Sequence, residues 1–370
     1  MKTSKFDFLK KKEFLIIIIG IIISLVIASH NISNFDRNIK NSHNNQENIL
    51  FKSDLSHSWE MADEFRSRLK NNENFFESFP VYNRTLLQPI LVGYYYYILD
   101  KEIYEKNKDG EKIIKINNFK IGILYIQIII FYLSVFFLTK SLIKKLKKRY
   151  IFLIILFLCL EPTILQWHSS FWTESLFLSM TIFLLCLMIN LPKKVFYHFP
   201  IGILLGLMYL HKAVSIFLII PIVIYYFLVF KKNLVPTTIL LFGYLSIILV
   251  IGINHYKKTN TFFITSPMHA YYSYYHYFAH KIYADRMGIS VKEAKNKLIE
   301  NENKWKKKEN IIIENDILKS DTKQLIKNIS YRNEIFLKEI IANPIFSLKF
   351  FTKKIIVMSV LDPSWVSQSF

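Results

Sequence analysis

Long runs of apolar residues, separated by clusters of lysine, constrain the fold of this chain more than any other feature of its sequence. A hydrocarbon layer about 30 Å thick is crossed by a helix of roughly 20 apolar residues, because a helix satisfies its backbone hydrogen bonds internally. The chain has six blocks that approach or exceed this length: 13–29, 119–139, 151–167, 175–191, 199–230 and 235–253. The sequence therefore predicts an all-α polytopic membrane protein.

The block 199–230 is too long for one crossing and too short for two. As one straight helix it would extend about 48 Å, against a hydrocarbon core of about 30 Å. One crossing would also place the lysines that follow it on the outer side. We therefore expect a bent pair, with a short helix at 199–210, a turn at His211–Lys212 and a longer helix at 213–230.

The positive charge of the chain predicts its orientation in the membrane. The net charge is +20, but no basic stripe with interleaved aromatic residues indicates a nucleic-acid partner, and none is expected. The lysines instead cluster at the ends of apolar blocks, in 10–12, 140–149, 193–194 and 231–232. Since basic residues beside spans mark the cytoplasmic side, we expect a multi-pass protein of the inner (plasma) membrane with a cytoplasmic N-terminus. Residues 30–118 and the turn around His168–Glu174 are then outside.

The first block has a second interpretation. A basic start, an apolar core and small residues near Ala28 are also typical of a signal peptide, with cleavage after Ala28. A retained anchor is favoured, because five further blocks follow and the apolar core is close to spanning length.

Residues 30–118 are too long for a simple connector. Within them, residues 54–70 have helical spacing, with Asp54 as the expected N-cap. The apolar face of this helix would carry Leu55, Trp59, Ala62, Phe65 or Arg66, and Leu69. We expect an amphipathic helix that rests on the outer surface of the membrane.

Two parts are expected along the chain. Residues 1–254 would form a transmembrane module with the outer loop 30–118, and residues 255–370 an extracytoplasmic, mostly helical segment. The mixed charges of residues 290–308 favour a solvated helix. The apolar tail at 344–361 is interrupted by three lysines and is expected to lie in the interface or to begin a span.

Several polar residues fall on the expected outer side, on segments that can converge. Ionisable groups at membrane depth are costly and usually line a polar cavity. The candidate site consists of Asp54, Arg84, Glu174, His211 and Lys212, with His57, Trp59, His168 and Asn254 as candidate substrate-binding residues. Carboxylates beside cations at a lipid–water boundary suit a lipid with an anionic headgroup. A lysine or arginine would bind its phosphate, while a carboxylate accepts a proton from an acceptor hydroxyl or holds a divalent metal.

Each of these residues also has an ordinary structural explanation. Asp54 and Glu174 are suited to helix N-termini, Arg84 to the membrane interface, and the histidines at 57 and 168 to interfacial packing. Lys212 is harder to explain in this way, because it interrupts an apolar block in which leucine would be less costly. The stronger evidence for a shared site is that all of these residues fall on the same expected side of the membrane.

The order of these motifs resembles the GT-C membrane glycosyltransferases, in particular the protein-mannosyltransferase-like group (glycosyltransferase family 39 and its bacterial relatives). The resemblance covers about residues 13–280 and rests on DLSHSWEMA (54–62), RTLLQP (84–89), TESL (173–176), GILLGLMYLHKAV (202–214) and INHYKKTNTFFITS (253–266). The chain lacks the family's prolines after Thr85 and Glu174, and His211–Lys212 replaces its arginine.

The resemblance implies a seven-helix module with a large first extracytoplasmic loop that carries amphipathic helices. It implies a polyprenyl-phosphate-sugar donor, a glycan, lipid or protein acceptor, and inversion at the anomeric carbon. Asp54 would be the general base or a metal ligand and Glu174 the second acid, while Arg84 and Lys212, with His211, would bind the lipid phosphate. Mg²⁺ or Mn²⁺ would be the cofactor, held by Asp54 and Glu174.

Two other functions remain open at this point. A polysaccharide polymerase or ligase would also use a lipid-linked sugar, but its main loop is expected late in the chain, whereas here the long loop precedes the second block. A transport or assembly protein is expected to show repeat symmetry between its halves, and the bent block 199–230 has no counterpart.

Overall fold

The computed structural model describes most of the chain. The described residues are 11–41, 53–79, 86–106, 112–113, 118–143, 145–169, 173–192, 194–212, 215–231, 233–260, 262, 278–313 and 322–360. They divide into two compact units, the first within Met1–Pro80 and Thr85–Asn254 and the second within Val81–Arg84 and His255–Phe370.

Three described helices of the first unit are long and apolar enough to cross a membrane: α1 (Lys11–Asn41), α4 (Asn118–Leu142) and α10 (Val235–Thr259). A fourth candidate is the bent pair of α5 (Lys148–Leu160) and α6 (Pro162–His168). Large apolar side chains face outward from them, such as Val26 at 63% exposed and Ile129 at 63%. Soluble proteins rarely expose apolar surface of this extent, so the prediction of a helical membrane protein is confirmed.

The expected span 151–167 is broken, which the sequence analysis did not anticipate. The axes of α5 and α6 are bent by 54°. At the break, Glu161 has an extended backbone, and its Oε2 accepts a hydrogen bond of 2.7 Å from the backbone N–H of Ile164. Pro162 follows as the first residue of α6. An N-cap acid followed by proline starts a new helix here, because proline disfavours helical geometry in the residue before it.

The block 199–230 forms two helices, as predicted. They are α8 (His198–His211), preceded by a short 3₁₀ turn (Val195–Tyr197), and α9 (Ile216–Phe230). Lys212 ends α8 with an extended backbone, at φ −143° and ψ 115°. Together with α7 (Thr173–Ile189), these helices are shorter than a full span, since 17 residues extend about 25 Å. The seven-helix module stays a prediction.

The predicted amphipathic helix is α2 (Ser53–Lys70), but its apolar face is covered by protein and not by lipid. Trp59, Ala62, Phe65 and Leu69 are buried, and α3 (Leu87–Ile98) packs against this face. The approach is so close that a Cβ on Gly93 of α3 would lie 2.5 Å from the Ala62 carbonyl oxygen. Asp54 is the second residue of α2 and not the residue before it.

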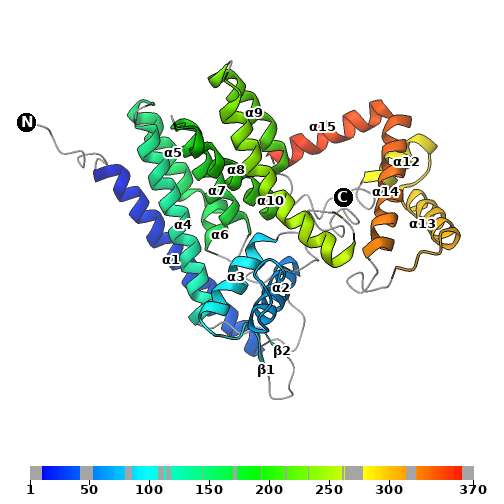
Figure 1. Ribbon diagram of the computed structural model, residues 1–370, viewed down its shortest axis with the longest axis horizontal. Coiled ribbons are helices and arrows are strands. Elements are labelled where there is room, and N and C mark those ends of the chain that lie inside the picture. Colours follow the sequence, from blue (N-terminus) through cyan, green and yellow to red (C-terminus); the bar gives the residue numbers. More distant parts are fainter. Residues whose placement is uncertain are drawn as a thin grey trace, which may run out of the picture. The chain divides into compact units, whose positions relative to one another are not determined.

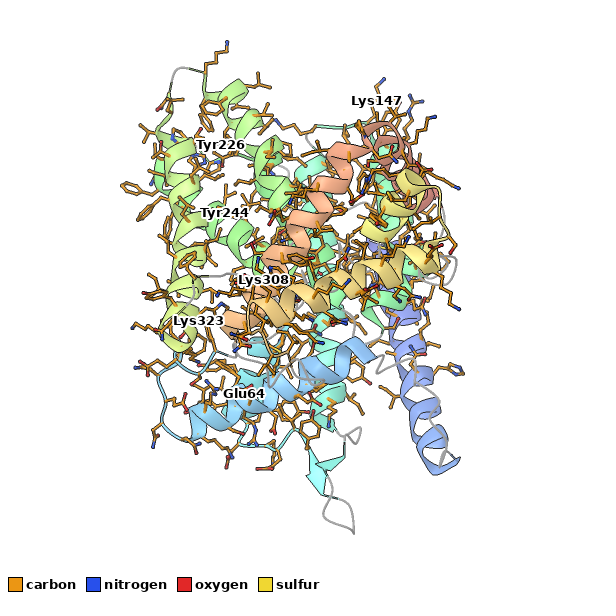
Figure 2. The ribbon with its side chains drawn as sticks, turned by 90° about the vertical axis from the view of Figure 1, so that its right-hand side faces the viewer. Glu64, Lys147, Tyr226, Tyr244, Lys308 and Lys323 are labelled. Atoms are coloured by element: carbon orange, nitrogen blue, oxygen red, sulfur yellow. The ribbon has the colours of Figure 1, made fainter. Side chains whose placement is uncertain are left out.

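Helices α2 and α3 lie at one end of the first unit, beside a two-stranded antiparallel hairpin (Figure 1). The strands are β1 (Glu105–Lys106) and β2 (Lys112–Ile113). Figure 2 shows α2 lying across the direction of α1, with Glu64 at this end of the unit and Lys147 at the opposite end. The prediction that α2 lies parallel to the membrane surface stays a prediction.

The second unit contains α12 (His280–Met287), α13 (Val291–Lys308), α14 (Thr322–Ala342) and α15 (Pro344–Val360). The Ser290 hydroxyl caps α13 by accepting a hydrogen bond from the backbone N–H of Glu293. Most side chains of the helix predicted as solvated at 290–308 are exposed, but Leu298 and Glu302 are buried. The helix turns one face toward α12 and α14, and only the opposite face is solvated.

Candidate functional site

Glu174 and Lys212 form an ion pair in the first unit. Glu174 lies in the first turn of α7, and Lys212 is the residue at which α8 ends. Since α7 and α8 pack against each other, the ends of both helices meet and the Lys212 Nζ donates to the Glu174 Oε1. The side chain of Lys212 is 24% exposed and that of Glu174 is 28% exposed, so the pair lies at a boundary between core and surroundings.

Both charges are favourably placed on their helices. A carboxylate in the first turn of α7 interacts with the positive end of that helix dipole, and an ammonium at the end of α8 with the negative end of the other. The Lys212 Nζ also lies 6.0 Å from the centre of the Phe177 ring, within cation–π range. The two groups thus compensate each other within an otherwise apolar region, where an uncompensated charge is costly.

His211, the residue beside Lys212, is fully buried. Its ring stacks on Phe177, with ring centres 6.4 Å apart and planes inclined by 23°. Phe177 therefore contacts both residues of the expected phosphate-binding pair. The His211 side chain is fully buried, whereas that of Lys212 is 24% exposed, so the lysine ammonium is the more accessible of the two groups.

The start of α3 is joined to the same corner. The backbone N–H of Leu86 donates a hydrogen bond of 3.0 Å to the Leu210 carbonyl oxygen near the end of α8. The described part of the segment, which begins at Leu86, is thus joined to the end of α8, the helix that Lys212 follows. Arg84 itself lies outside the described residues, as do the side chains of Asp54 and His57. Their roles stay predictions, although α2, α3, α7 and α8 pack in one series within one unit.

His168 lies in the interior of the first unit. It is fully buried and stacks on Phe131, with ring centres 4.2 Å apart. Its Nε2 lies 2.9 Å from the Ser24 hydroxyl, which in turn lies 2.8 Å from the Tyr132 hydroxyl. The three groups join α6, α1 and α4. The expected substrate-binding role of His168 stays a prediction, while the geometry shows a link between three helices.

Trp59 and Asn254 are also buried. The Trp59 ring packs edge-on against Tyr96, at 6.4 Å between ring centres, and the Lys120 Nζ lies 5.7 Å from it. Both contacts hold α2 against α3 and the first turn of α4. Asn254 lies near the end of α10. A substrate-binding role for either residue stays a prediction.

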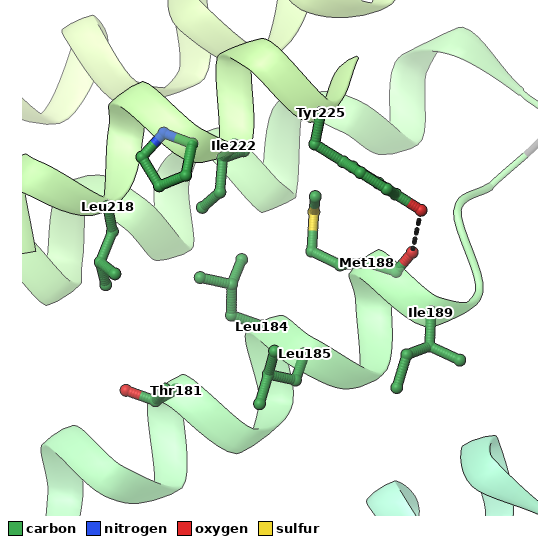
Figure 3. Close-up of a pocket in the computed structure, with 9 residues that line it drawn as sticks. Thr181, Leu184, Leu185, Met188, Ile189, Leu218, Ile222 and Tyr225 are labelled. Atoms are coloured by element: carbon green, nitrogen blue, oxygen red, sulfur yellow. Dashed lines mark hydrogen bonds between the residues drawn. The ribbon is translucent and has the colours of Figure 1, made fainter. Parts of the chain in front are cut away.

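An apolar cavity lies between α7, the helix that carries Glu174, and α9 (Figure 3). It has a volume of about 350 Å³, and Leu184 of α7 faces Leu218 and Ile222 of α9 across it. The Tyr225 hydroxyl donates a hydrogen bond of 3.4 Å to the Met188 carbonyl oxygen at one end. Thr181, which lines the cavity, is seven residues after Glu174, or about 10 Å along the helix. Sequence reasoning missed this cavity, because an uninterrupted apolar block does not show which of its faces are left unpacked.

A metal centre is not assembled by the described side chains. Among the described residues, no group of three or more His, Cys, Asp or Glu side chains is placed to hold an ion. The Glu174 Oε1 is instead bound by Lys212. Metal binding that involves Asp54 stays a prediction, since its side chain lies outside the described residues.

Neither a family model, nor a curated protein, nor a solved structure matches this chain. The resemblance to GT-C glycosyltransferases therefore rests on the short motifs of the sequence.

Proposed function

We propose that this protein is a membrane glycosyltransferase that transfers a sugar from a polyprenyl-phosphate-linked donor to an acceptor at the outer face of the membrane. The observation that carries the proposal is the Glu174–Lys212 ion pair, which lies where two apolar helices end. A lipid-linked phosphate combines an anionic group with a hydrocarbon chain. The site combines an ammonium with apolar helix surface in the same way.

Lys212 would bind the donor phosphate and stabilise it as the leaving group. The phosphate would replace the Glu174 carboxylate as the partner of the ammonium, because both are anionic oxygen acceptors. In the transfer, the acceptor oxygen forms a bond to the anomeric carbon, and the bond from that carbon to the phosphate oxygen breaks. Its electron pair stays on the phosphate, and the proton of the acceptor hydroxyl passes to a carboxylate, for which Asp54 and Glu174 are the candidates.

The cavity between α7 and α9 supports a lipid-linked donor. It is lined almost entirely by aliphatic side chains and Tyr225, and it begins about 10 Å along α7 from Glu174 (Figure 3). A hydrocarbon chain whose phosphate is bound by Lys212 would reach the cavity within a few isoprene lengths. Such a chain would enter laterally from the bilayer.

The test is mass spectrometry of surface glycans, glycolipids and glycoproteins. Cells that lack the protein would be complemented with the native chain or with Glu174→Gln or Lys212→Met. We expect the native chain to restore one sugar modification and each variant to reduce it at least tenfold. Lys145→Gln, a change in an exposed loop of the same unit, is the matched control and should restore it fully. An identical glycan profile with and without the protein would refute the proposal.

Exchanging the charges of Glu174 and Lys212 distinguishes a loss of activity from a loss of folding. In the double variant Glu174→Lys with Lys212→Glu, the ion pair can re-form with reversed polarity, so the protein should still fold and accumulate, although each charge then opposes its helix dipole. The donor phosphate would then have to bind a lysine at position 174 on α7 and not one at the end of α8. A lipid chain bound there would no longer be aligned with the cavity. We expect no sugar transfer. A double variant with native activity would show that the pair has only a structural role.

A further inference from the structure

The second unit exposes a row of large aliphatic side chains at the corner between α14 and α15. Leu337 is 56% exposed, Ile341 76%, Ile345 70% and Leu348 71%. Isolated exposed apolar residues are common, but here Leu337 and Ile341 lie one turn apart on α14, and Ile345 and Leu348 lie one turn apart on α15. We call this set the 337–348 face.

The helices that carry the 337–348 face use their opposite sides for the core of the unit. Leu325, Ile329 and Ser347 are buried, and Phe336 and Phe351 pack with Phe278. The corner is continuous, since the Ser347 backbone N–H and hydroxyl both donate to the Asn343 carbonyl oxygen. The 337–348 face is therefore a separate surface and not a loosely packed part of the core.

Basic residues border the 337–348 face. Lys349 and Lys353 are exposed on α15, and this helix has no acidic residue in its sequence PIFSLKFFTKKIIVMSV. Lys338 on α14 is also exposed and is paired with Glu334 at 2.7 Å. An aliphatic surface with lysines at its border is typical of helices that lie in a membrane interface, where the lysines contact anionic headgroups.

The chain keeps this surface close to a membrane. Residues 260–279 connect α10, a candidate span, to α12, and a chain of this length reaches about 70 Å at most. A lipid surface is thus present at high local concentration, whereas an acidic soluble protein would have to be recruited.

We propose that the 337–348 face lies in the interface of a membrane that contains anionic lipids, with Lys349 and Lys353 at the headgroups. The second unit is then attached to the bilayer at two places, through α10 and through this face. This inference does not depend on the proposed glycosyl transfer.

The test uses the full-length chain in lipid nanodiscs with about one third anionic lipid. A fluorophore whose emission depends on polarity is attached at Ile341→Cys or Leu348→Cys, in a background with Cys159→Ala and Cys186→Ala. We expect blue-shifted emission and at least twofold quenching by spin-labelled lipids. Lys304→Cys is the control, because this side chain is 70% exposed on the solvated side of α13, and its label should show neither effect.

Two results would overturn the proposal. Unshifted emission at positions 341 and 348 would place the 337–348 face in water. A blue shift without quenching by lipid would show that protein covers it, either the first unit or a second copy of the chain.

The role of the charges is tested in the same system. Lys349→Glu with Lys353→Glu should reduce lipid quenching at position 341 at least twofold, whereas Lys297→Glu with Lys304→Glu on α13 should not. Unchanged hydrogen exchange of α13 and α14 would show that both variants remain folded. Equal quenching in the charge-reversed variant, or in nanodiscs of zwitterionic lipid alone, would refute the contribution of anionic lipid.

Discussion

A polar side chain within an apolar helix is costly without a partner, and the structure shows the partners of several of them. Ser24 illustrates this, because its hydroxyl donates to the Gly20 carbonyl oxygen at 2.9 Å and also meets Tyr132 and His168. Glu174 likewise has a partner, because its carboxylate forms an ion pair with the Lys212 ammonium. From the sequence, the polar residues could be assigned to one side of the membrane, but a one-dimensional pattern does not show whether a residue bonds to a ligand or to another helix.

In the second unit, the charged residue Glu302 is almost fully buried and has several partners. Its carboxylate accepts hydrogen bonds from the Arg332 Nε at 3.0 Å and from the Asn328 Nδ2 at 3.1 Å, and it pairs with the Lys306 Nζ at 2.8 Å. Burial by itself raises the pKa of Glu302, but the hydrogen bonds and charges of Arg332 and Lys306 outweigh it and leave the pKa lowered. The network joins α13 to α14.

We predict that Glu302→Gln loosens the second unit. The change leaves the buried Arg332 guanidinium without its countercharge, which typically costs about 3 to 5 kcal/mol. Hydrogen exchange followed by mass spectrometry should show faster exchange in α13 and α14 of the full-length protein. Glu300→Gln, on the solvated side of the same helix, should leave exchange unchanged. Equal rates in both variants would contradict the prediction.

The same network predicts a dependence on pH. A lowered pKa means that the folded state binds the proton more weakly than the unfolded state, so the stabilisation is complete above the ordinary glutamate pKa of 4.5. It is lost as the pH falls through the lower pKa of the folded state. We expect the free energy of opening of α13 and α14, obtained from exchange rates corrected for their intrinsic pH dependence, to fall below about pH 4.5. Glu302→Gln should weaken this acid dependence, and an unchanged dependence would assign it to other groups.

At the scale of elements, glycines determine how closely two helices of the first unit pack. A Cβ at Gly202 of α8 would lie 2.0 Å from the Leu240 carbonyl oxygen of α10, and a Cβ at Gly243 of α10 would lie 2.3 Å from the Phe199 carbonyl oxygen. Since backbone atoms form both contacts, no side chain can move aside. Small residues at helix contacts are typical of membrane helices, where association depends on close packing.

We predict that Gly202→Ala separates α8 from α10. Overpacking of this kind costs about 1 to 3 kcal/mol, so the midpoint of thermal unfolding in detergent should fall by several degrees. Gly122→Ala is the matched control, because the nearest atom there is the flexible end of the Tyr95 side chain. Its effect should be clearly smaller. Equal effects of the two variants would show that the glycines do not set the helix distance.

At the scale of the whole molecule, one end of the first unit carries a loop rich in lysine, and the opposite end carries α2 (Figure 2). Lys147 lies at the end of the unit opposite Glu64 (Figure 2), within the basic loop between α4 and α5. Positive charge beside spans marks the cytoplasmic side, so α2 and the Glu174–Lys212 pair are expected outside. The orientation stays a prediction until it is measured.

Labelling of intact cells with a membrane-impermeant maleimide tests this sidedness. We predict that Glu64→Cys is labelled and that Lys147→Cys is labelled only after the membrane is permeabilised. The native Cys159 and Cys186 are buried and should give little background. Labelling of Lys147→Cys from outside would reverse the orientation and move the proposed site to the cytoplasm.

The sequence by itself determined the local features of this protein. The lengths of the apolar blocks predicted the membrane helices, the arithmetic on 199–230 predicted its break near Lys212, and the periodicity of 54–70 predicted which residues form the apolar face of α2. These features follow from which residues avoid water and how far a helix extends, and both can be read along one segment.

Only the tertiary structure decided what each surface meets. It placed α3 on the apolar face of α2, paired Glu174 with Lys212, and left a cavity between α7 and α9. The physical reason is that hydrophobicity is not directional. It drives a face out of water but does not choose among lipid, another helix and a ligand, and this choice depends on shapes and charges from segments far apart in the chain.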